Sequence, residues 1–188
     1  MRLLPKNIGI LSFLGPFKKH QEIFESLGVM SSFVKSLEDL ESVDALVIPG
    51  TEIASLHFSL KELLPYVSKR QKEGMPLFLT GEALVLLAEA ELTDISFKKM
   101  DIQKFHIDSP RRFNEDIRLS FSDTRDFSAP YVRPPKIQRV SKGFHVLASK
   151  RHDASEPVCI EKDNILACSF YPEFSGDKRI HEYFLTKI

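Results

Sequence analysis

The feature that most constrains this sequence is a series of short apolar runs that each end at a turn residue. Asp44-Ala-Leu-Val-Ile-Pro-Gly50 is apolar until it reaches Pro-Gly, and Leu77-Phe-Leu79 runs directly into Thr80-Gly81-Glu82. Apolar runs of about 4–8 residues between turn signals are typical of strands that are buried on both faces of a sheet. Because such strands need covering layers on both sides, the runs predict an α/β protein.

Helical patterns alternate with these runs in the first half of the chain. Lys18–Leu27 places Ile23, Phe24 and Leu27 on one stripe, and Gly28 follows as a helix stop. Further strands are expected at Asn7–Phe13 and Ser31–Val34, and further helices at Leu60–Lys72, Ala83–Leu92 and His181–Ile188. The strand at Leu77–Leu79, the turn at Gly81 and the following helix make an elbow, which presents the nucleophile in several hydrolase folds.

The second half of the chain has the pattern of short strands. They are expected at Ile95–Phe97, Ile117–Phe121, Tyr131–Val132, Gln138–Val140, Phe144–Ala148, Val158–Ile160 and Ile165–Phe170. The polar segment Lys98–Asn114 is predicted to be an irregular loop. Together the two halves predict one domain over residues 1–188, built on a mixed sheet flanked by helices.

The composition argues against several classes of function. Lys and Arg total 26, as do Asp and Glu, so no net field favours nucleic acid or an acidic membrane. No apolar run approaches the roughly 20 residues that span a bilayer, and the histidines have no metal-ligand spacing. Cys159 and Cys168 lie in apolar runs, which indicates buried, inert thiols. We therefore expect a cytoplasmic protein without nucleic-acid or membrane partners, metal or cofactor.

Five ordered stretches carry a resemblance to a known family. They are Ile8-Gly-Ile-Leu-Ser-Phe-Leu-Gly15 with His20, Asp44-Ala-Leu-Val-Ile-Pro-Gly-Thr-Glu52, Pro76-Leu-Phe-Leu-Thr-Gly-Glu-Ala-Leu-Val-Leu-Leu-Ala88, Tyr131-Val-Arg-Pro-Pro135 and Leu166-Ala-Cys-Ser-Phe-Tyr-Pro-Glu173. In this order they resemble the PdxT/Sno glutaminases, which supply ammonia to pyridoxal 5′-phosphate synthase. The resemblance implies a class I glutamine amidotransferase-like (flavodoxin-like) fold and, as a partner, the synthase subunit.

The resemblance also identifies the residues that stand at the positions of the family's catalytic triad. The family uses a cysteine at the elbow to attack glutamine, a histidine to move protons and a glutamate to orient that histidine. Gly81 stands where the cysteine should be, and Tyr171 stands where the histidine should be. Only Glu173 remains, so no functional catalytic residue is expected.

The residues expected around a vestigial ligand pocket are also partly altered. Thr51 replaces a second glycine of the family, Glu82 follows the elbow, and Ile53 replaces a serine next to the matching Glu52. We expect glutamine to bind weakly or not at all, because these changes remove polar contacts. The predicted pocket residues are Gly50, Thr51, Glu52, Glu82 and Arg133.

Three functions follow from these substitutions. The chain is a PdxT-like pseudoglutaminase that serves as a non-catalytic partner of the synthase, or an enzyme with repurposed chemistry, or a small-molecule binding module that uses the former pocket. We favour the first. The carboxylates of Glu52, Glu82 and Glu173 are the groups on which a repurposed enzyme would depend.

Overall fold

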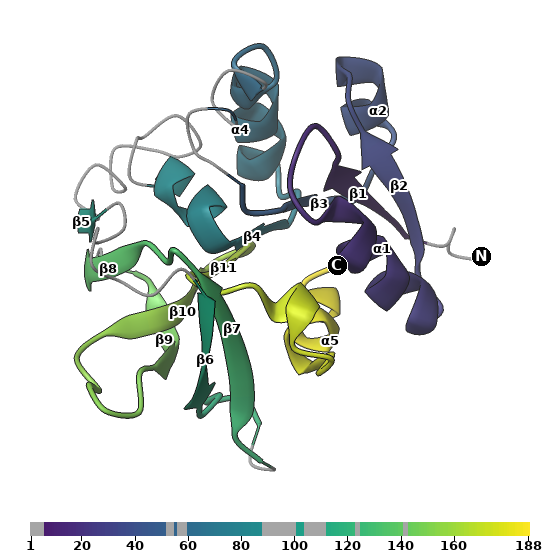
Figure 1. The fold of residues 1–188 in the computed structure, drawn as a ribbon. Coiled ribbons are helices and arrows are strands. Elements are labelled where there is room, and N and C mark those ends of the chain that lie inside the picture. The colour runs from purple at the N-terminus through teal and green to yellow at the C-terminus, as the bar shows by residue number, and fades with distance from the viewer. Residues whose placement is uncertain are drawn as a thin grey trace.

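A seven-stranded sheet in the order β2-β1-β3-β4-β11-β10-β9 forms the centre of the computed structural model (Figure 1). The structure describes residues 6–51, 55, 60–87, 101–103, 112–122, 125–140 and 143–188. The sheet strands are β1 Asn7–Leu11, β2 Met30–Val34, β3 Ala45–Ile48, β4 Leu77–Thr80, β9 His145–Ser149, β10 Pro157–Lys162 and β11 Ile165–Cys168. Strands β1 to β4 and β11 run parallel, whereas β9 and β10 continue the sheet antiparallel. The predicted mixed α/β sheet is confirmed.

Successive side chains of the central strands enter two separate cores. In β3, Ala45 and Val47 pack on one face of the sheet, whereas Leu46 and Ile48 pack on the other. All four are fully buried. This double burial is the reason why these strands read as continuous apolar runs in the sequence.

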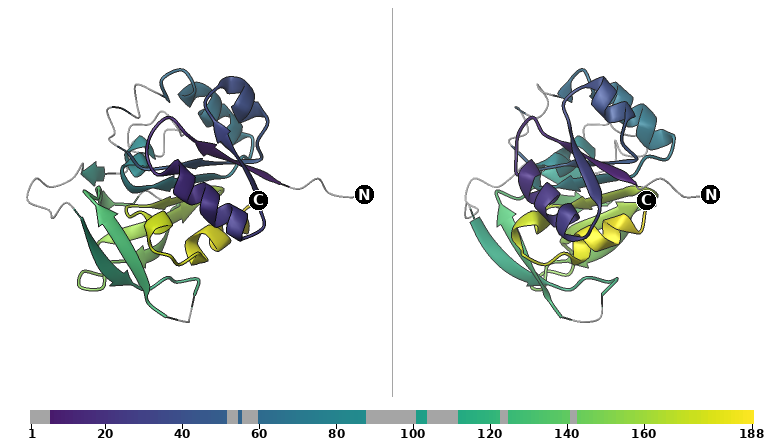
Figure 2. Two further views of the ribbon diagram at one scale, coloured as in Figure 1. Left: turned by 45° about the vertical axis from the view of Figure 1, so that its right-hand side comes forward. Right: turned by 90° about the vertical axis from the view of Figure 1, so that its right-hand side faces the viewer.

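Helices cover both faces of the sheet (Figure 2). The helices are α1 Phe17–Ser26, α2 Leu37–Glu41, α4 Leu64–Lys72 and α5 Arg179–Leu185, with 3₁₀ turns η1 Gly81–Leu87 and η3 Pro172–Phe174. The helices α2 and α4, together with η1, pack on one face, whereas α1 and α5 pack on the other. Within the described part of the chain, no helix is long and apolar enough to cross a membrane.

Two of these elements differ from the sequence-based expectation. The helix α2 was not predicted, although Ser36 and Asp39 form a reciprocal capping box at its start. The segment after the elbow, predicted as a helix over Ala83–Leu92, is a 3₁₀ turn that ends at Leu87 among the described residues. The elbow itself is present, because β4 runs directly into η1 at Gly81.

Two two-stranded antiparallel sheets stand beside the main sheet, and the second of them is a hairpin. They are formed by β5 Asp101–Gln103 with β8 Lys136–Arg139, and by β6 Arg112–Ile117 with β7 Phe127–Val132. The prediction of an irregular loop over Lys98–Asn114 is therefore wrong at 101–103 and 112–114. In β6, Phe113 and Ile117 pack against the core, whereas Arg112, Asn114 and Asp116 are exposed. Because only one face of the hairpin packs against the core, the strand has a mostly polar sequence, and this sequence was mistaken for a loop.

Arg179 at the start of α5 holds the loop that connects β6 to β7. Its guanidinium donates to Oγ of Ser122 at 3.0 Å, to the carbonyl of Arg125 at 2.7 Å and to the carbonyl of Asp126 at 3.2 Å. It also donates through Nη2 to Oδ2 of Asp177 at 2.7 Å. One side chain thus ties the segment that precedes β7 to the C-terminal helix.

We predict that Arg179→Lys lowers the free energy of unfolding by about 1.5–3 kcal/mol, because lysine cannot reproduce a planar fork of donors. Arg118→Lys is the matched control, since the Arg118 side chain is 82% exposed and forms a surface ion pair with Asp126. It should change stability by less than about 0.5 kcal/mol. Urea unfolding measures both variants, and equal losses would contradict the structural importance of Arg179.

Candidate functional site

The candidate site lies at the carboxyl ends of β4 and β11, where open α/β sheets place their ligands. Gly81, directly after β4, has a φ of +53°, a left-handed conformation that favours glycine. Its N–H donates to the carbonyl oxygen of Phe170 at 3.0 Å, which joins the elbow to the segment that follows β11. The turn thus has the position of a nucleophile elbow but carries no side chain.

The ring of Tyr171 occupies the space in which an elbow side chain would lie. A Cβ added to Gly81 would lie 2.5 Å from Cε2 and 2.6 Å from the hydroxyl oxygen of Tyr171, and closer still to Cζ. Contacts shorter than 3.0 Å are essentially never seen for a real Cβ. Gly50 is also closed to a side chain, because its Cβ would lie 2.5 Å from the carbonyl oxygen of Thr80 and 2.8 Å from Cε1 of the same ring. Tyr171 therefore fits only against glycines.

The hydroxyl of Tyr171 also forms a hydrogen bond with a backbone N–H of the elbow. Its oxygen accepts a hydrogen bond from the backbone N–H of Glu82. In elbow-type hydrolases the N–H after the nucleophile position is one of the donors that hold the oxyanion. Burial, and then the negative charge of Glu82, hold the pKa of Tyr171 well above its usual value of 10.0. The phenol therefore stays protonated at neutral pH and is a poor general base.

Glu173 is buried and contacts side chains of β4 and α1. Its Oε1 accepts a hydrogen bond from Oγ1 of Thr80 at 3.2 Å and lies 3.2 Å from Nε2 of His20. Thr80 in turn accepts a hydrogen bond from the backbone N–H of Gly50 at 3.2 Å. Glu173 is thus held by β4 and α1.

A second histidine extends this buried group. Nδ1 of His20 lies 3.0 Å from Nε2 of His181, and both rings are fully buried. Because Glu173 is an acceptor when ionised, we assign the Nε2 proton of His20 to the contact with Glu173 and the Nε2 proton of His181 to the contact with His20. The contact of His20 with Glu173 is close but poorly aligned, since Nε2 meets the distance for an ion pair and not the hydrogen-bond angle.

The predicted pocket residues are only partly brought together. Gly50 and Glu82 are buried beside Tyr171, and Thr51 is half-buried next to Gly50. Arg133 is exposed just after β7 and has a φ of +43°, a strained conformation for arginine. Glu52 lies outside the described residues.

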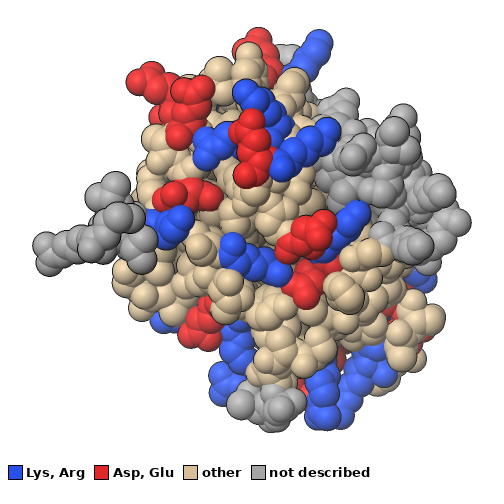
Figure 3. Space-filling view, turned by 180° about the vertical axis from the view of Figure 1, so that it is seen from behind, with Lys and Arg blue, Asp and Glu red and all other residues tan. Residues whose placement is uncertain are grey.

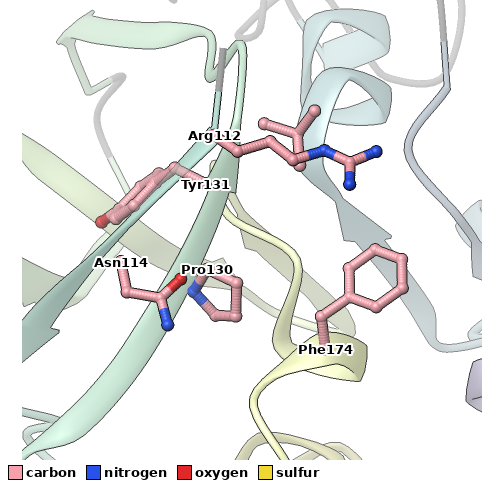
Figure 4. Close-up of a pocket in the computed structure, with 6 residues that line it drawn as sticks. Arg112, Asn114, Pro130, Tyr131 and Phe174 are labelled. Atoms are coloured by element: carbon pink, nitrogen blue, oxygen red, sulfur yellow. The ribbon is translucent and has the colours of Figure 1, made fainter. Parts of the chain in front are cut away.

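The sequence-based interpretation missed both Thr80 and a cavity. The signal for Thr80 was a polar residue at the end of an apolar strand. The cavity has a volume of about 390 Å³ and lies between the β6–β7 hairpin and η3 (Figure 4). Its lining residues, none of which was predicted as a site residue, are Arg112, Asn114, Pro130, Tyr131, Val132 and Phe174.

Other reactive side chains in the described part of the chain offer no alternative chemistry. The thiols of Cys159 and Cys168 face each other at 3.4 Å across β10 and β11, and both are fully buried. Burial raises the pKa of Cys168 well above its usual value, so the thiol is a poor nucleophile. Among the described residues, no group of three or more His, Cys, Asp or Glu side chains is placed to hold a metal ion.

We predict that acid destabilises the fold through His181. Burial, and then the nearby His20, lower the pKa of His181 well below its usual value of 6.5. The unfolded chain therefore binds a proton that the folded chain does not, and this stability is present above pH ~6.5 and lost as the pH falls below it, by up to about 1.4 kcal/mol per pH unit. Urea unfolding between pH 7.5 and 5.5 measures this slope, and His181→Gln should flatten it. An unchanged slope in the variant would contradict the assignment.

We also predict that Gly81→Ala costs clearly more than Gly28→Ala. Gly28 is the matched control, since it too has a positive φ, of +73°, but a Cβ there meets nothing within 4 Å. The control should lose about 1 kcal/mol from backbone strain, whereas Gly81→Ala should lose about 1–3 kcal/mol more from the collision with Tyr171. In a Tyr171→Ala background the additional loss should disappear. Equal losses for the two alanine variants in denaturant melts would overturn the packing argument.

Comparison with known proteins gives one consistent result. The SNO glutamine amidotransferase family matches residues 10–188. The pyridoxal 5′-phosphate synthase subunit PdxT of Thermotoga petrophila is 32% identical over 189 residues, which cover 96% of this chain and 98% of that protein. The PdxT subunit of Exiguobacterium sibiricum is 35% identical over 190 residues, with 96% and 95% covered. A glutamine amidotransferase crystal structure has a TM-score of 0.84 at 28% identity, with 96% and 97% of the two chains covered. The chain therefore belongs to the SNO glutamine amidotransferase family.

Proposed function

We propose that this chain is a catalytically inactive PdxT-like pseudoglutaminase that acts as a non-catalytic partner of a pyridoxal 5′-phosphate synthase. The observation that carries the proposal is the packing of the Tyr171 ring against Gly81. A Cβ at position 81 would lie 2.6 Å from the tyrosine hydroxyl, so the nucleophile and the space for it are both missing.

The remaining parts of the triad chemistry support the same function. A protonated phenol stands where the family has its proton-transfer histidine, and it accepts the hydrogen bond of the Glu82 N–H that would otherwise face an oxyanion. Glu173 contacts Thr80 and His20 instead of orienting a catalytic base. Nucleophilic attack, proton transfer and charge stabilisation are therefore all compromised together.

The proposed partner follows from the relatives. The similar proteins from Thermotoga petrophila and Exiguobacterium sibiricum are subunits of pyridoxal 5′-phosphate synthase, and their match extends over nearly the whole chain. Protein partners also fit the surface better than nucleic acid does. Lys and Arg alternate with Asp and Glu over the described residues of the face shown in Figure 3.

Of the two other functions, a repurposed enzyme gains no specific support from the described residues. Glu82 and Glu173 are both buried, but Glu173 is already held by Thr80 and His20. One observation supports a small-molecule binding module, namely the cavity beside Phe174. This cavity does not lie between Gly50 and the elbow, where the sequence placed a pocket, because the Tyr171 ring packs against both glycines there.

We predict that the purified protein releases no ammonia from glutamine, alone or with the synthase subunit of the same organism. Gly81→Cys alone should also release none, because triad residues act as a unit and Tyr171 stays in place. An intact PdxT glutaminase assayed with its synthase is the positive control. Glutamine-dependent ammonia release above the buffer background would refute the pseudoglutaminase.

Association with the synthase subunit is tested separately. Size-exclusion chromatography of the mixed proteins should give a complex that contains both chains, with ammonia release still at background. Separate elution at concentrations where the intact glutaminase binds would remove the partner from the proposal and leave the inactivity unaffected.

A further inference from the structure

The cavity beside η3 has the dimensions of a small-ligand site. Its volume of about 390 Å³ lies within the range of roughly 300–1,000 Å³ that is usual for ligand pockets. The register of the hairpin pairs Arg112 with Val132 and Asn114 with Pro130. These four residues therefore share one face of the β6–β7 hairpin, and this face forms one wall of the cavity.

An aromatic ring forms the opposite wall. Phe174 extends from η3 and is 50% exposed, although it is a large apolar side chain. In Figure 4 its ring and the side chain of Arg112 border the same open space, whereas the ring of Tyr131 points away. Tyr131 instead stacks on Phe113, with ring centroids 4.8 Å apart, on the inner face of the hairpin.

Arg112 is the charged residue of the lining. Among the residues that the structure describes, the Arg112 guanidinium has no hydrogen-bond or ion-pair partner, and the lining includes no carboxylate to balance it. An unpaired guanidinium presents a planar fork of donors that matches a carboxylate in two parallel hydrogen bonds. The cavity thus offers a cationic end at Arg112, an amide at Asn114 and an apolar wall at Phe174 and Pro130.

We propose that this cavity binds a small aromatic carboxylate. The carboxylate pairs with Arg112 and receives a hydrogen bond from Asn114, and the aromatic body packs between Phe174 and Pro130. A phosphate dianion fits less well, because the lining supplies one cation only. Free glutamine fits less well too, since its ammonium group would find no lining carboxylate and its body offers no ring.

Titration with phenylacetate, followed by calorimetry and by amide NMR, tests the site. We expect a dissociation constant at or below about 1 mM, with shifts centred on Asn114 and Phe174. The neutral probe 2-phenylethanol and glutamine should each bind at least about tenfold more weakly than phenylacetate, because neither supplies both the carboxylate and the ring. These titrations need no glutaminase activity and no synthase, so their failure is distinguishable from failure of the proposed function.

Substitutions of three exposed residues distinguish binding in the cavity from unspecific binding elsewhere on the surface. Arg112→Gln should weaken phenylacetate about tenfold or more, and Phe174→Ala about fivefold. Arg118→Gln is the control, since it removes an exposed arginine outside the cavity and should change affinity less than about twofold. The proposal is overturned if phenylacetate causes no shifts up to about 10 mM, a tenfold excess over the weakest expected dissociation constant. Equal binding of 2-phenylethanol, or equal affinities of Arg112→Gln and Arg118→Gln, would overturn it as well.

Discussion

The buried carboxylate of Glu173 is the constraint on which the arrangement of the site depends. An ionised carboxylate is costly to bury without partners. Thr80 on β4 and His20 on α1 supply them, and His181 on α5 supports His20 in turn. One polar group thus connects the central strand, the helices on one face of the sheet and η3. Since η3 follows Tyr171 directly, this connection also holds the tyrosine ring against the elbow.

The elbow and the ring of Tyr171 are complementary in shape. An elbow that carries a nucleophile holds a side chain in a strained left-handed conformation, which costs about 1–3 kcal/mol. Gly81 adopts the same conformation without that cost, and the ring of Tyr171 fills the vacated space with its hydroxyl on the Glu82 N–H. The elbow therefore combines the backbone geometry of a nucleophile turn with the close packing of a protein core.

The sequence predicted those parts of the structure that depend on local pattern. The strands β3 and β4 followed from their apolar runs, and the elbow followed from the turn at Gly81. The strand β6 was missed, because one of its faces is polar and its pattern resembles a loop. The pair of His20 and His181 lies 161 residues apart along the chain, so only the fold brings the two rings together. Gly81 and Tyr171 were each identified by resemblance, but their mutual contact is a property of packing that no local pattern contains.

The fit between Gly81 and Tyr171 also restricts which substitutions either position can accept alone. A cysteine that appeared first would collide with the ring, because even its Cβ has no room. A histidine that appeared first would leave a void beside the glycine, since the imidazole is smaller than the phenol, and would gain no nucleophile to activate. Each single substitution is expected to lose stability, so the two positions should show epistasis. The packing of one ring on one glycine therefore favours paired substitutions over single substitutions at these two positions.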